Sequence, residues 1–278
     1  MSIASEITRI NNNIANAYTQ CSNKGATMPA TQNSANLANT ISTISGGGGG
    51  TDYYNTTIDK TYSYSSGDQY WINMVKKIPA LTIASGITSL AYTFYNYPLQ
   101  TLAFDGIDCS NITNLESIFA YSNTSNSRIK TIDLANITNT DNVSSVRYIF
   151  YNASTLENVS NIFPLTGTVD IRNAFGDCSK LKTLDLSNWN VSLNNNASGF
   201  MRNCYKLAII DISGIEFNSR ITTTITFSNC GRDCLQSDGA YADGIPYVYV
   251  KNETQQSLIL SKYAPSTWST NNVVVKQN

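Results

Sequence analysis

The chain has 278 residues, of which 13% are charged and 41% hydrophobic, and its formal net charge at pH 7 is −1. This length allows a short module beside a main domain that has its own core. The small net charge, without a basic block, argues against an electrostatic grip on nucleic acid or anionic lipid. Histidine is absent, which excludes Ser-His-Asp and Cys-His nucleophile systems and every histidine-containing metal site.

Polar side chains without charge dominate the remaining composition. Asparagine alone occupies 34 positions, so Asn, Ser and Thr must supply the solubility that charged residues usually provide. The six cysteines form no CxxC pair, and Glu6 stands where a secretory signal would need apolar residues. No apolar run approaches the ~18 residues of a membrane span. We therefore expect synthesis in the bacterial cytoplasm, where the chain stays until something else exports it, with reduced thiols, no membrane insertion and no cofactor.

Residues 1–45 predict two amphipathic helices that form an anchoring or oligomerisation module. In both, apolar or small residues recur at spacings of four and three, which is typical of a coiled-coil-like seam. Two short helices have too little apolar surface to be stable alone, so we expect burial between chains. Isoleucine at both seam positions favours a homotrimer, with an intramolecular hairpin or docking on another protein as alternatives. The seam residues are Ile3, Ile7, Ile10, Ile14, Ala17 and Cys21 in the first helix and Leu37, Ile41 and Ile44 in the second.

The segment EITRINNNIANAYTQCSNKGATMPATQNSANLANTISTI resembles the N-terminal module of tail-fibre and other virion-appendage proteins from phages and prophages of Gram-positive bacteria. The resemblance covers residues 1 to about 45 and rests on the order of AY, KGAT, P, QNS, NLA and a final Ile-rich helix before glycine. It implies that this end binds other virion proteins and precedes a variable outer domain. Residues 46–51 are expected to form a flexible glycine linker.

Residues 52–77 are rich in aromatic side chains, including Tyr62, Tyr64 and Trp71, and are expected to cap the first turn of a repeat domain. The repeat itself occupies residues 78–234. Each unit has an aromatic residue or methionine, then a small residue, then aliphatics at LxxLxL spacing that predict a short strand with alternate side chains inward. Such strands must stack into a parallel sheet to bury that face. Successive units start at Phe94, Phe119, Phe150, Phe175, Met201 and Phe227.

Two irregular units are expected within this pattern. Ile78, Leu81 and Ile83 repeat the aliphatic spacing and are expected to add one turn in the same register. The unit that begins at Phe150 has Asn161 where the last aliphatic would align, which predicts a local bend or loop.

The units AFGDCSKLKTLDLSNW and FMRNCYKLAIIDIS resemble the leucine-rich repeats of BspA-type bacterial surface proteins, whose motif is FxxCxxLxxLDLS. The resemblance implies a leucine-rich-repeat solenoid with a parallel β-sheet that serves adhesion or recognition without chemistry. Residues 235–278 are expected to form a C-terminal cap: a strand, a helix over 253–262 and a final strand over 273–276. Such a cap covers the open edge of the last repeat.

Two sets of repeat positions are candidate sites. Cys178, Cys204 and Cys230 share one position on successive turns, which favours packing of small side chains over a metal cluster. Outward strand positions predict a binding face, because solenoids usually bind partners on such a surface. Its residues are Thr101, Thr131, Asp133, Thr183, Asp185, Ile209 and Asp211.

Asp185 and Asp211 would lie about one strand spacing apart, ~4.8 Å, a separation that suits the paired carboxylates of a glycosidase. A solvated polar side chain is also what an outward strand position requires, so we expect a surface role rather than catalysis. Tyrosine-rich surfaces around the aromatic turns are alternative contacts.

These observations predict a non-enzymatic phage virion protein. Its N-terminus would bind tail, baseplate or capsid proteins, and its repeat domain would contact a glycan or protein of the host surface. The alternatives are a purely structural decoration of the virion, a bacterial surface adhesin and a polysaccharide depolymerase.

Overall fold

The computed structural model describes residues 14–15, 17–19, 30–32, 57–64, 77–193, 197–219, 226–234 and 245–277. The chain divides into two compact units, Met1–Asn55 and Thr56–Asn278. In the first unit, residues 14–15 and 17–19 are helical, with Ile14 and Ala17 half-buried and Tyr18 buried. The other predicted seam residues and the 46–51 linker lie outside the described residues, so the two-helix module stays a prediction.

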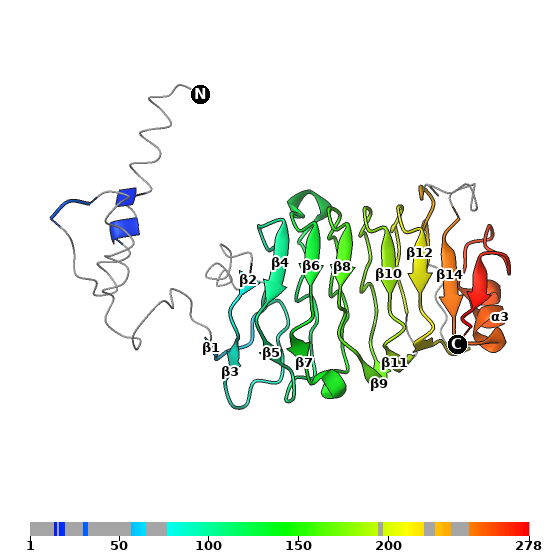
Figure 1. Cartoon of the computed structure of the whole chain (residues 1–278), viewed down its shortest axis with the longest axis horizontal. Helices are drawn as coiled ribbons and strands as arrows, with labels where there is room; N and C mark the ends of the chain where they lie inside the picture. The colour runs from blue at the N-terminus through cyan, green and yellow to red at the C-terminus, as the bar shows by residue number, and fades with distance from the viewer. Residues whose placement is uncertain are drawn as a thin grey trace, which may run out of the picture. The chain divides into compact units, whose positions relative to one another are not determined.

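The second unit is a parallel β-solenoid of about seven turns (Figure 1). One strand from each turn enters a row of two four-stranded parallel sheets, ordered β2-β4-β6-β8 and β10-β12-β14-β15. We call the outward surface of this row the strand face. The strands are β2 (Lys77–Ile78), β4 (Thr101–Phe104), β6 (Thr131–Asp133), β8 (Asn158–Ser160), β10 (Thr183–Asp185), β12 (Ile209–Asp211), β14 (Tyr247–Val250) and β15 (Val273–Val275).

Two further ladders, which we call the second and the third, also connect the turns. The second consists of short parallel strands in the orders β1-β3, β5-β7 and β13-β11-β9. The third consists of single parallel bridges that run from turn to turn: Ser89 to Asn114, Asn114 to Ser145, and Ser145 to Asp170. The second-ladder strands are β1 (Thr57–Ile58), β3 (Thr82–Ile83), β5 (Ile107–Asp108), β7 (Ile137–Thr138), β9 (Thr166–Val169), β11 (Asn190–Leu193) and β13 (Ile215–Glu216), and two 3-10 turns are η2 (Thr124–Asn126) and η3 (Thr140–Asn142).

The predicted inward aliphatics are confirmed in the strands that carry the repeat most clearly. Leu102 pairs with Ile132, and Leu184 pairs with Ile210, each of them buried. Alternate side chains of a strand point to opposite sides, so this register gathers the aliphatics into one core. The spacing of the LxxLxL motif therefore determines both the strand and the direction of its side chains.

The expected register of the first turn is wrong. Ile78 pairs with Phe104, the last position of β4, whereas Leu81 bridges to Ile107 and Ile83 pairs with Ile58. The strand ends at Ile78 because Pro79 follows it and has no N–H to continue the ladder. The aliphatic spacing in this segment thus spans two different ladders.

The row of sheets is interrupted between β8 and β10, in the unit where a bend is expected. Asn161 follows β8 and has a φ of 53°. Its side-chain amide donates to the Asp133 carboxylate at 2.9 Å. A polar residue in this conformation replaces the aliphatic that would continue the strand into the core.

A column of phenylalanine rings passes through the turns. Phe150 stacks on Phe119 at 5.3 Å and on Phe175 at 5.4 Å between ring centroids. At the next turn the Phe175 N–H donates to the Phe200 carbonyl, the register that aligns Met201 with Phe175. The neighbouring ring is nevertheless Phe200, at 6.0 Å. Met201 is the predicted start of its unit, but the adjacent phenylalanine completes the column.

Asparagine has a conformational role at the turns in addition to its contribution to solubility. Among the described residues, seven of the eleven non-glycine residues with positive φ are asparagines. Asparagine tolerates this left-handed conformation better than most residues because its short amide can bond locally. The Asn229 amide donates to Asn203, and the Asn203 amide donates to Asp177, so these side chains also link successive turns.

The predicted file of cysteines lies in the core. Cys178 and Cys204 are fully buried, and their thiols donate to the carbonyls of Phe150 and Phe175 on the preceding turns at 3.2 and 3.0 Å. Burial raises the pKa of the thiols of Cys178, Cys204 and Cys230. A small side chain with one weak donor fits this position between turns.

The C-terminal segment has the predicted order of strand, helix and strand. The helix α3 (Glu253–Lys262) begins after Asn252, whose side chain accepts the Gln255 N–H. The side chain of Gln255 in turn makes two hydrogen bonds with the backbone of Phe217, so the helix is fixed to the last turns. The strands β14 and β15 continue the parallel sheet, which extends the solenoid into the segment expected to be only a cap.

The phenylalanine column predicts the effect of a core substitution. Phe150→Ala removes a ring that contacts both neighbouring rings and should lower the free energy of unfolding by about 3–5 kcal/mol. Tyr64→Ala, at an aromatic side chain that is 67% exposed, should lower it by less than about 1 kcal/mol. Urea unfolding followed by circular dichroism measures both. Equal losses for the two variants would contradict the column's structural role.

The burial of the cysteines predicts their reactivity. In the native protein, Cys178 and Cys204 should resist alkylation by iodoacetamide, because both thiols are inaccessible and their pKa values are raised. Both should react fully in denaturant. Peptide mass spectrometry after timed labelling gives the extent at each cysteine, and rapid native labelling of either would show that these turns are open.

Candidate functional site

The strand face carries the predicted binding residues in two adjacent rows. The first row contains Thr101, Thr131, Thr183 and Ile209, all of them exposed. The ladders pair Thr101 with Thr131 and Thr183 with Ile209, while the break between β8 and β10 separates the two pairs. The structure thus brings these residues onto one surface, and their role in binding stays a prediction.

The second row contains the three predicted aspartates, which differ in their surroundings. Asp133 is half-buried, Asp185 is exposed, and Asp211 is paired with Asp185 in the ladder. The expectation that all three are solvated is wrong for Asp211, which is only 8% exposed. Its carboxylate accepts hydrogen bonds from the Ser213 hydroxyl at 2.6 Å and from the Lys276 ammonium at 2.6 Å.

The same local hydrogen bond explains why aspartate recurs at this repeat position. Each carboxylate accepts the backbone N–H two residues further along: Asp133 from Ala135, Asp185 from Ser187, and Asp211 from Ser213. This arrangement is an Asx turn, which ends the strand and starts the next corner of the solenoid. The aspartates therefore have a structural role that does not depend on a ligand.

Asp185 and Asp211 lack the electrostatics of an acid/base pair. Desolvation acts to raise the pKa of Asp185, but hydrogen bonds from Ser187 and the charge of Lys276 outweigh it and lower that pKa. Asp211 is held in an ion pair with Lys276. Glycoside hydrolysis needs one carboxyl whose pKa is raised, so that it carries a proton at neutral pH. The lowered pKa of Asp185 runs against this requirement, and the Asp211 carboxylate is already bound by Lys276.

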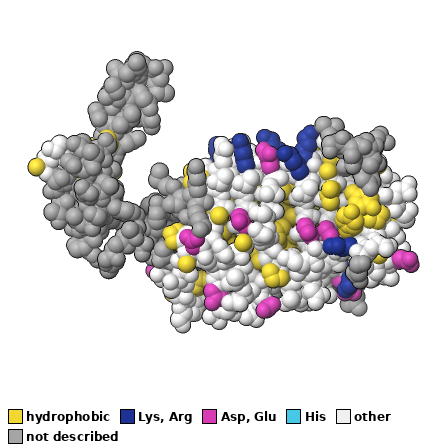
Figure 2. Space-filling view, in the orientation of Figure 1, with side chains coloured by type: hydrophobic (Ala, Val, Ile, Leu, Met, Phe, Trp, Pro, Cys, Tyr) yellow, Lys and Arg dark blue, Asp and Glu magenta, His cyan; other side chains and the backbone are white. Residues whose placement is uncertain are grey.

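Sequence reasoning missed an aromatic part of the strand face. Tyr247 lies beside Ile209 and Tyr249 beside Asp211 in the ladder between β12 and β14. The two tyrosine rings meet edge to face, with centroids 4.9 Å apart. Figure 2 shows hydrophobic side chains gathered over β12 and β14, beside acidic and basic side chains. The alternation in the sequence YVYV indicates that both tyrosines share one strand side, but it does not reveal that this strand extends the sheet.

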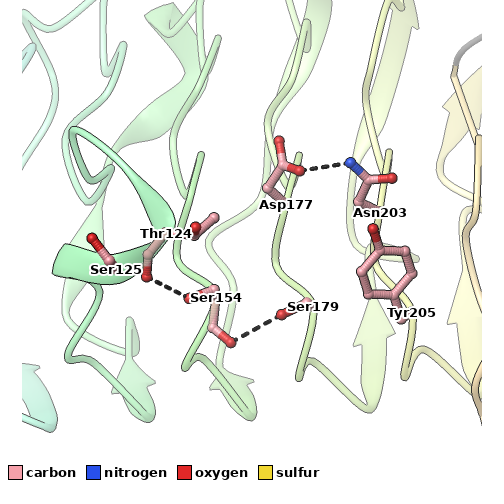
Figure 3. A pocket seen from close by; sticks show the side chains of 7 residues that line it. All are labelled: Thr124, Ser125, Ser154, Asp177, Ser179, Asn203 and Tyr205. Atoms are coloured by element: carbon pink, nitrogen blue, oxygen red, sulfur yellow. Dashed lines mark hydrogen bonds between the residues drawn. The ribbon is translucent and has the colours of Figure 1, made fainter.

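A shallow groove of about 450 Å³ crosses the turns that precede β6, β8, β10 and β12 (Figure 3). Its polar groups largely bond one another: Ser154 donates to the Thr124 carbonyl, and Asn203 donates to Asp177. The second oxygen of Asp177 accepts from Arg202 at 2.8 Å. These bonds link turns, and they leave few groups in the groove for a ligand. The lining residues are Thr124, Ser125, Ser154, Asp177, Ser179, Asn203 and Tyr205.

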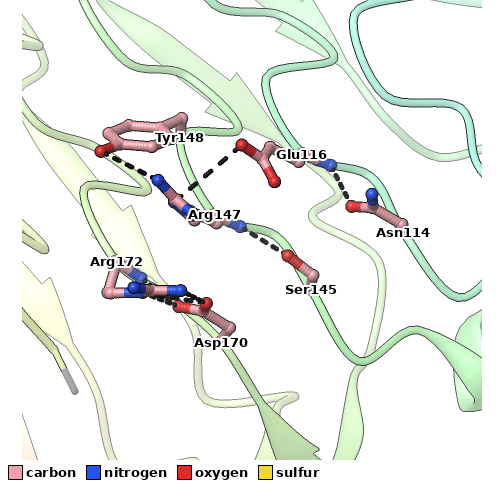
Figure 4. Close-up of polar contacts among 7 residues, drawn as sticks. All are labelled: Asn114, Glu116, Ser145, Arg147, Tyr148, Asp170 and Arg172. Atoms are coloured by element: carbon pink, nitrogen blue, oxygen red, sulfur yellow. Dashed lines mark hydrogen bonds and ion pairs between the residues drawn. The ribbon is translucent and has the colours of Figure 1, made fainter.

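A charged stripe follows the third ladder (Figure 4). Asn114, Ser145 and Asp170 each accept the N–H of the residue two positions later. Those residues are Glu116, Arg147 and Arg172, and their charges are matched within the stripe. The Arg147 guanidinium lies 3.9 Å from Glu116, and Arg172 forms a forked pair with Asp170. The stripe therefore repeats the local side-chain bond of the aspartate row, while the ion pair between Arg147 and Glu116 joins two successive turns.

Within the described ranges, no group of three or more Cys, Asp or Glu side chains is placed so that it could hold a metal ion. The helices in those ranges are also too short or too polar to cross a membrane. The strand face is the candidate functional site because its ladders hold the outward side chains in register, with a polar end at β4 and β6 and an aromatic end at β12 and β14.

The comparisons with known proteins concern the repeat region. Residues 88–207 and 138–234 match a family described as "Mycoplasma protein of unknown function, DUF285". No curated protein and no solved structure matches the chain. Residues 1–45 lie outside both family matches, so their likeness to tail-fibre modules stays a prediction. The matches together span more than half of the chain and agree with BspA-type repeats, and the chain belongs to the DUF285 family.

Proposed function

We propose that the chain is a recognition protein whose strand face contacts a partner on a host surface. The observation that carries the proposal is the separation of roles within each strand: inward aliphatics form the core, while outward residues such as Thr131 and Thr183 are exposed and take no part in it. Stacked turns hold these outward side chains in fixed register. Solenoids commonly use such an extended surface for binding.

The proposal is a role without catalysis, and the surroundings of Asp185 and Asp211 support it. Asp185 has a lowered pKa, and Asp211 is bound to Lys276, so a depolymerase acting through this pair has little support. The hydrogen bonds to Ser187 and Ser213 also explain both aspartates as turn formers.

We place the protein on a phage virion, with the N-terminus bound to a tail, baseplate or capsid protein. The support is the resemblance of residues 1–45 to modules of virion appendages. Trimerisation through the isoleucine seam would present three strand faces on one particle. Several weak contacts to a surface glycan or protein would then combine into firm attachment through effective concentration.

The family match favours a second candidate. The match agrees with the repeats of BspA-type bacterial surface proteins, so the same face could serve as an adhesin on a bacterial cell. Labelling of intact, phage-free cells with an antibody to the chain distinguishes an adhesin from a virion protein.

The isoleucine seam predicts the oligomeric state. Ile10→Asp places a charge in the seam and should convert the full-length trimer to monomer, because burying an unpaired carboxylate is unfavourable. Asn12→Asp, off the seam, should leave the trimer intact. Sedimentation equilibrium gives both masses. A monomeric wild-type chain, or an unchanged trimer in Ile10→Asp, would contradict oligomerisation through this seam.

If the strand face binds the partner, substitutions on it should weaken attachment to host cells, whereas substitutions elsewhere should not. Thr183→Arg adds a bulky charge to the exposed face of β10 and should weaken binding of the full-length protein to intact Gram-positive host cells at least tenfold. The matched control is Asn190→Arg, at an exposed strand position of β11 on the second ladder. Flow cytometry with fluorescently labelled protein measures both. Equal binding by the two variants would exclude the strand face, and no binding by wild type would favour a purely structural virion protein.

A further inference from the structure

The strand face changes its chemistry along the solenoid. On the strands from β4 to β10 its first row presents short polar side chains, from Thr101 to Thr183. At β12 and β14 the same row continues with Ile209 and Tyr247, which pair in the ladder. Ile209 is 46% exposed, which is unusual among the large aliphatic residues that the structure describes. An apolar end on an otherwise polar face indicates a local contact with a ligand.

The second row adds a ring to this apolar end. Tyr249 follows Asp211 in the ladder and is in turn paired with Val274 of β15. Its ring meets that of Tyr247 at 4.9 Å with an interplanar angle of 74°. Ile209, Tyr247 and Tyr249 therefore form one small platform, which we call the tyrosine platform. Tyrosine presents a large contact area and loses little side-chain entropy when it binds.

The dimensions of the platform restrict what it can hold. Neighbouring strands lie about 4.8 Å apart, and residues two apart on a strand lie about 7 Å apart. The platform thus matches one or two sugar rings. A stable protein interface buries about 800 Å² on each partner and would have to extend far over the polar part of the face.

Charged groups stand at the edge of the platform. Asp185 is exposed, and its carboxylate uses one oxygen for the Ser187 N–H. An ionised carboxylate has about four acceptor positions, so hydroxyl donors can bind those that remain. Lys276 is bound to Asp211 and so neutralises its charge. A ligand with an apolar face and a rim of hydroxyl groups satisfies both the rings and the carboxylate.

We infer that the tyrosine platform, together with Asp185, binds pyranose rings of a neutral surface glycan. The inference rests on the proposed recognition function and names the ligand class for one end of the strand face. The C–H face of the sugar would pack on Tyr247, Tyr249 and Ile209, and its hydroxyl groups would donate to Asp185.

A glycan microarray tests the inference directly with the full-length chain. The array carries neutral hexose and N-acetylhexosamine oligosaccharides beside sialylated and sulfated ones. We expect binding to neutral pyranosides, a loss of at least tenfold in Tyr249→Ala and Ile209→Asp, and retention in Tyr249→Phe. Asn190→Ala, at an exposed position of β11 on the second ladder and outside the strand face, should bind as wild type does. Circular dichroism melting of each variant verifies the fold.

Absence of neutral-glycan binding on the array, or unchanged binding in Tyr249→Ala, would overturn the inference. Attachment of the protein to host cells treated with periodate or protease distinguishes failure of the glycan inference from failure of the proposed function. Periodate oxidises glycan diols and should reduce attachment to intact host cells at least tenfold, whereas protease treatment of the cells should leave it unchanged. If protease treatment abolished attachment and periodate did not, the receptor would be a protein. That result would overturn the glycan inference but leave the recognition function in place. No attachment to untreated cells would contradict the recognition function itself.

Discussion

The stacking of one turn on the next is the constraint on which the rest of this structure depends. No turn contains enough residues to bury its own aliphatic row, so each relies on its neighbours for both hydrogen bonds and packing. Phe119, Phe150 and Phe175 show this directly, because each ring has its main aromatic neighbours on adjacent turns. The thiols of Cys178 and Cys204 likewise donate to carbonyls of the preceding turn. Core packing, ladder hydrogen bonds and polar side-chain bonds thus all join each turn to the next one along the solenoid.

Much of the fold could be predicted from the sequence because the repeat is a local signal. The inward aliphatics follow from spacing alone, and helix α3 has the predicted bounds of 253–262. The register of the first turn was wrong because Pro79 ends the strand there, whereas the alignment of Met201 with Phe175 is confirmed and the adjacent Phe200 supplies the neighbouring ring. Asp211 looked solvated because its partner, Lys276, lies 65 residues away in the chain. Tyr247 and Tyr249 were missed for the same reason, since only pairing with β12 places them on the strand face.

The division between inward and outward positions also explains how such a protein could acquire a binding function. Substitution of an outward residue leaves the core intact, whereas the Asx turns of Asp133, Asp185 and Asp211 limit change at the strand ends. Recognition would therefore be expected to depend on positions such as Thr183, Ile209 and Tyr249. The apolar end at β12 and β14 stands out because it places aromatic rings on the outward side of the sheet.

Hydrogen–deuterium exchange of the full-length protein, followed by mass spectrometry, tests most directly whether stacked turns hold the strand face as one rigid surface. The account predicts slow exchange of comparable rate in β4, β6, β10, β12 and β14, since their ladders join neighbouring turns. Fast exchange in β10 or β12 would contradict it, because the outward residues of these strands would then have no fixed register in which to meet a partner.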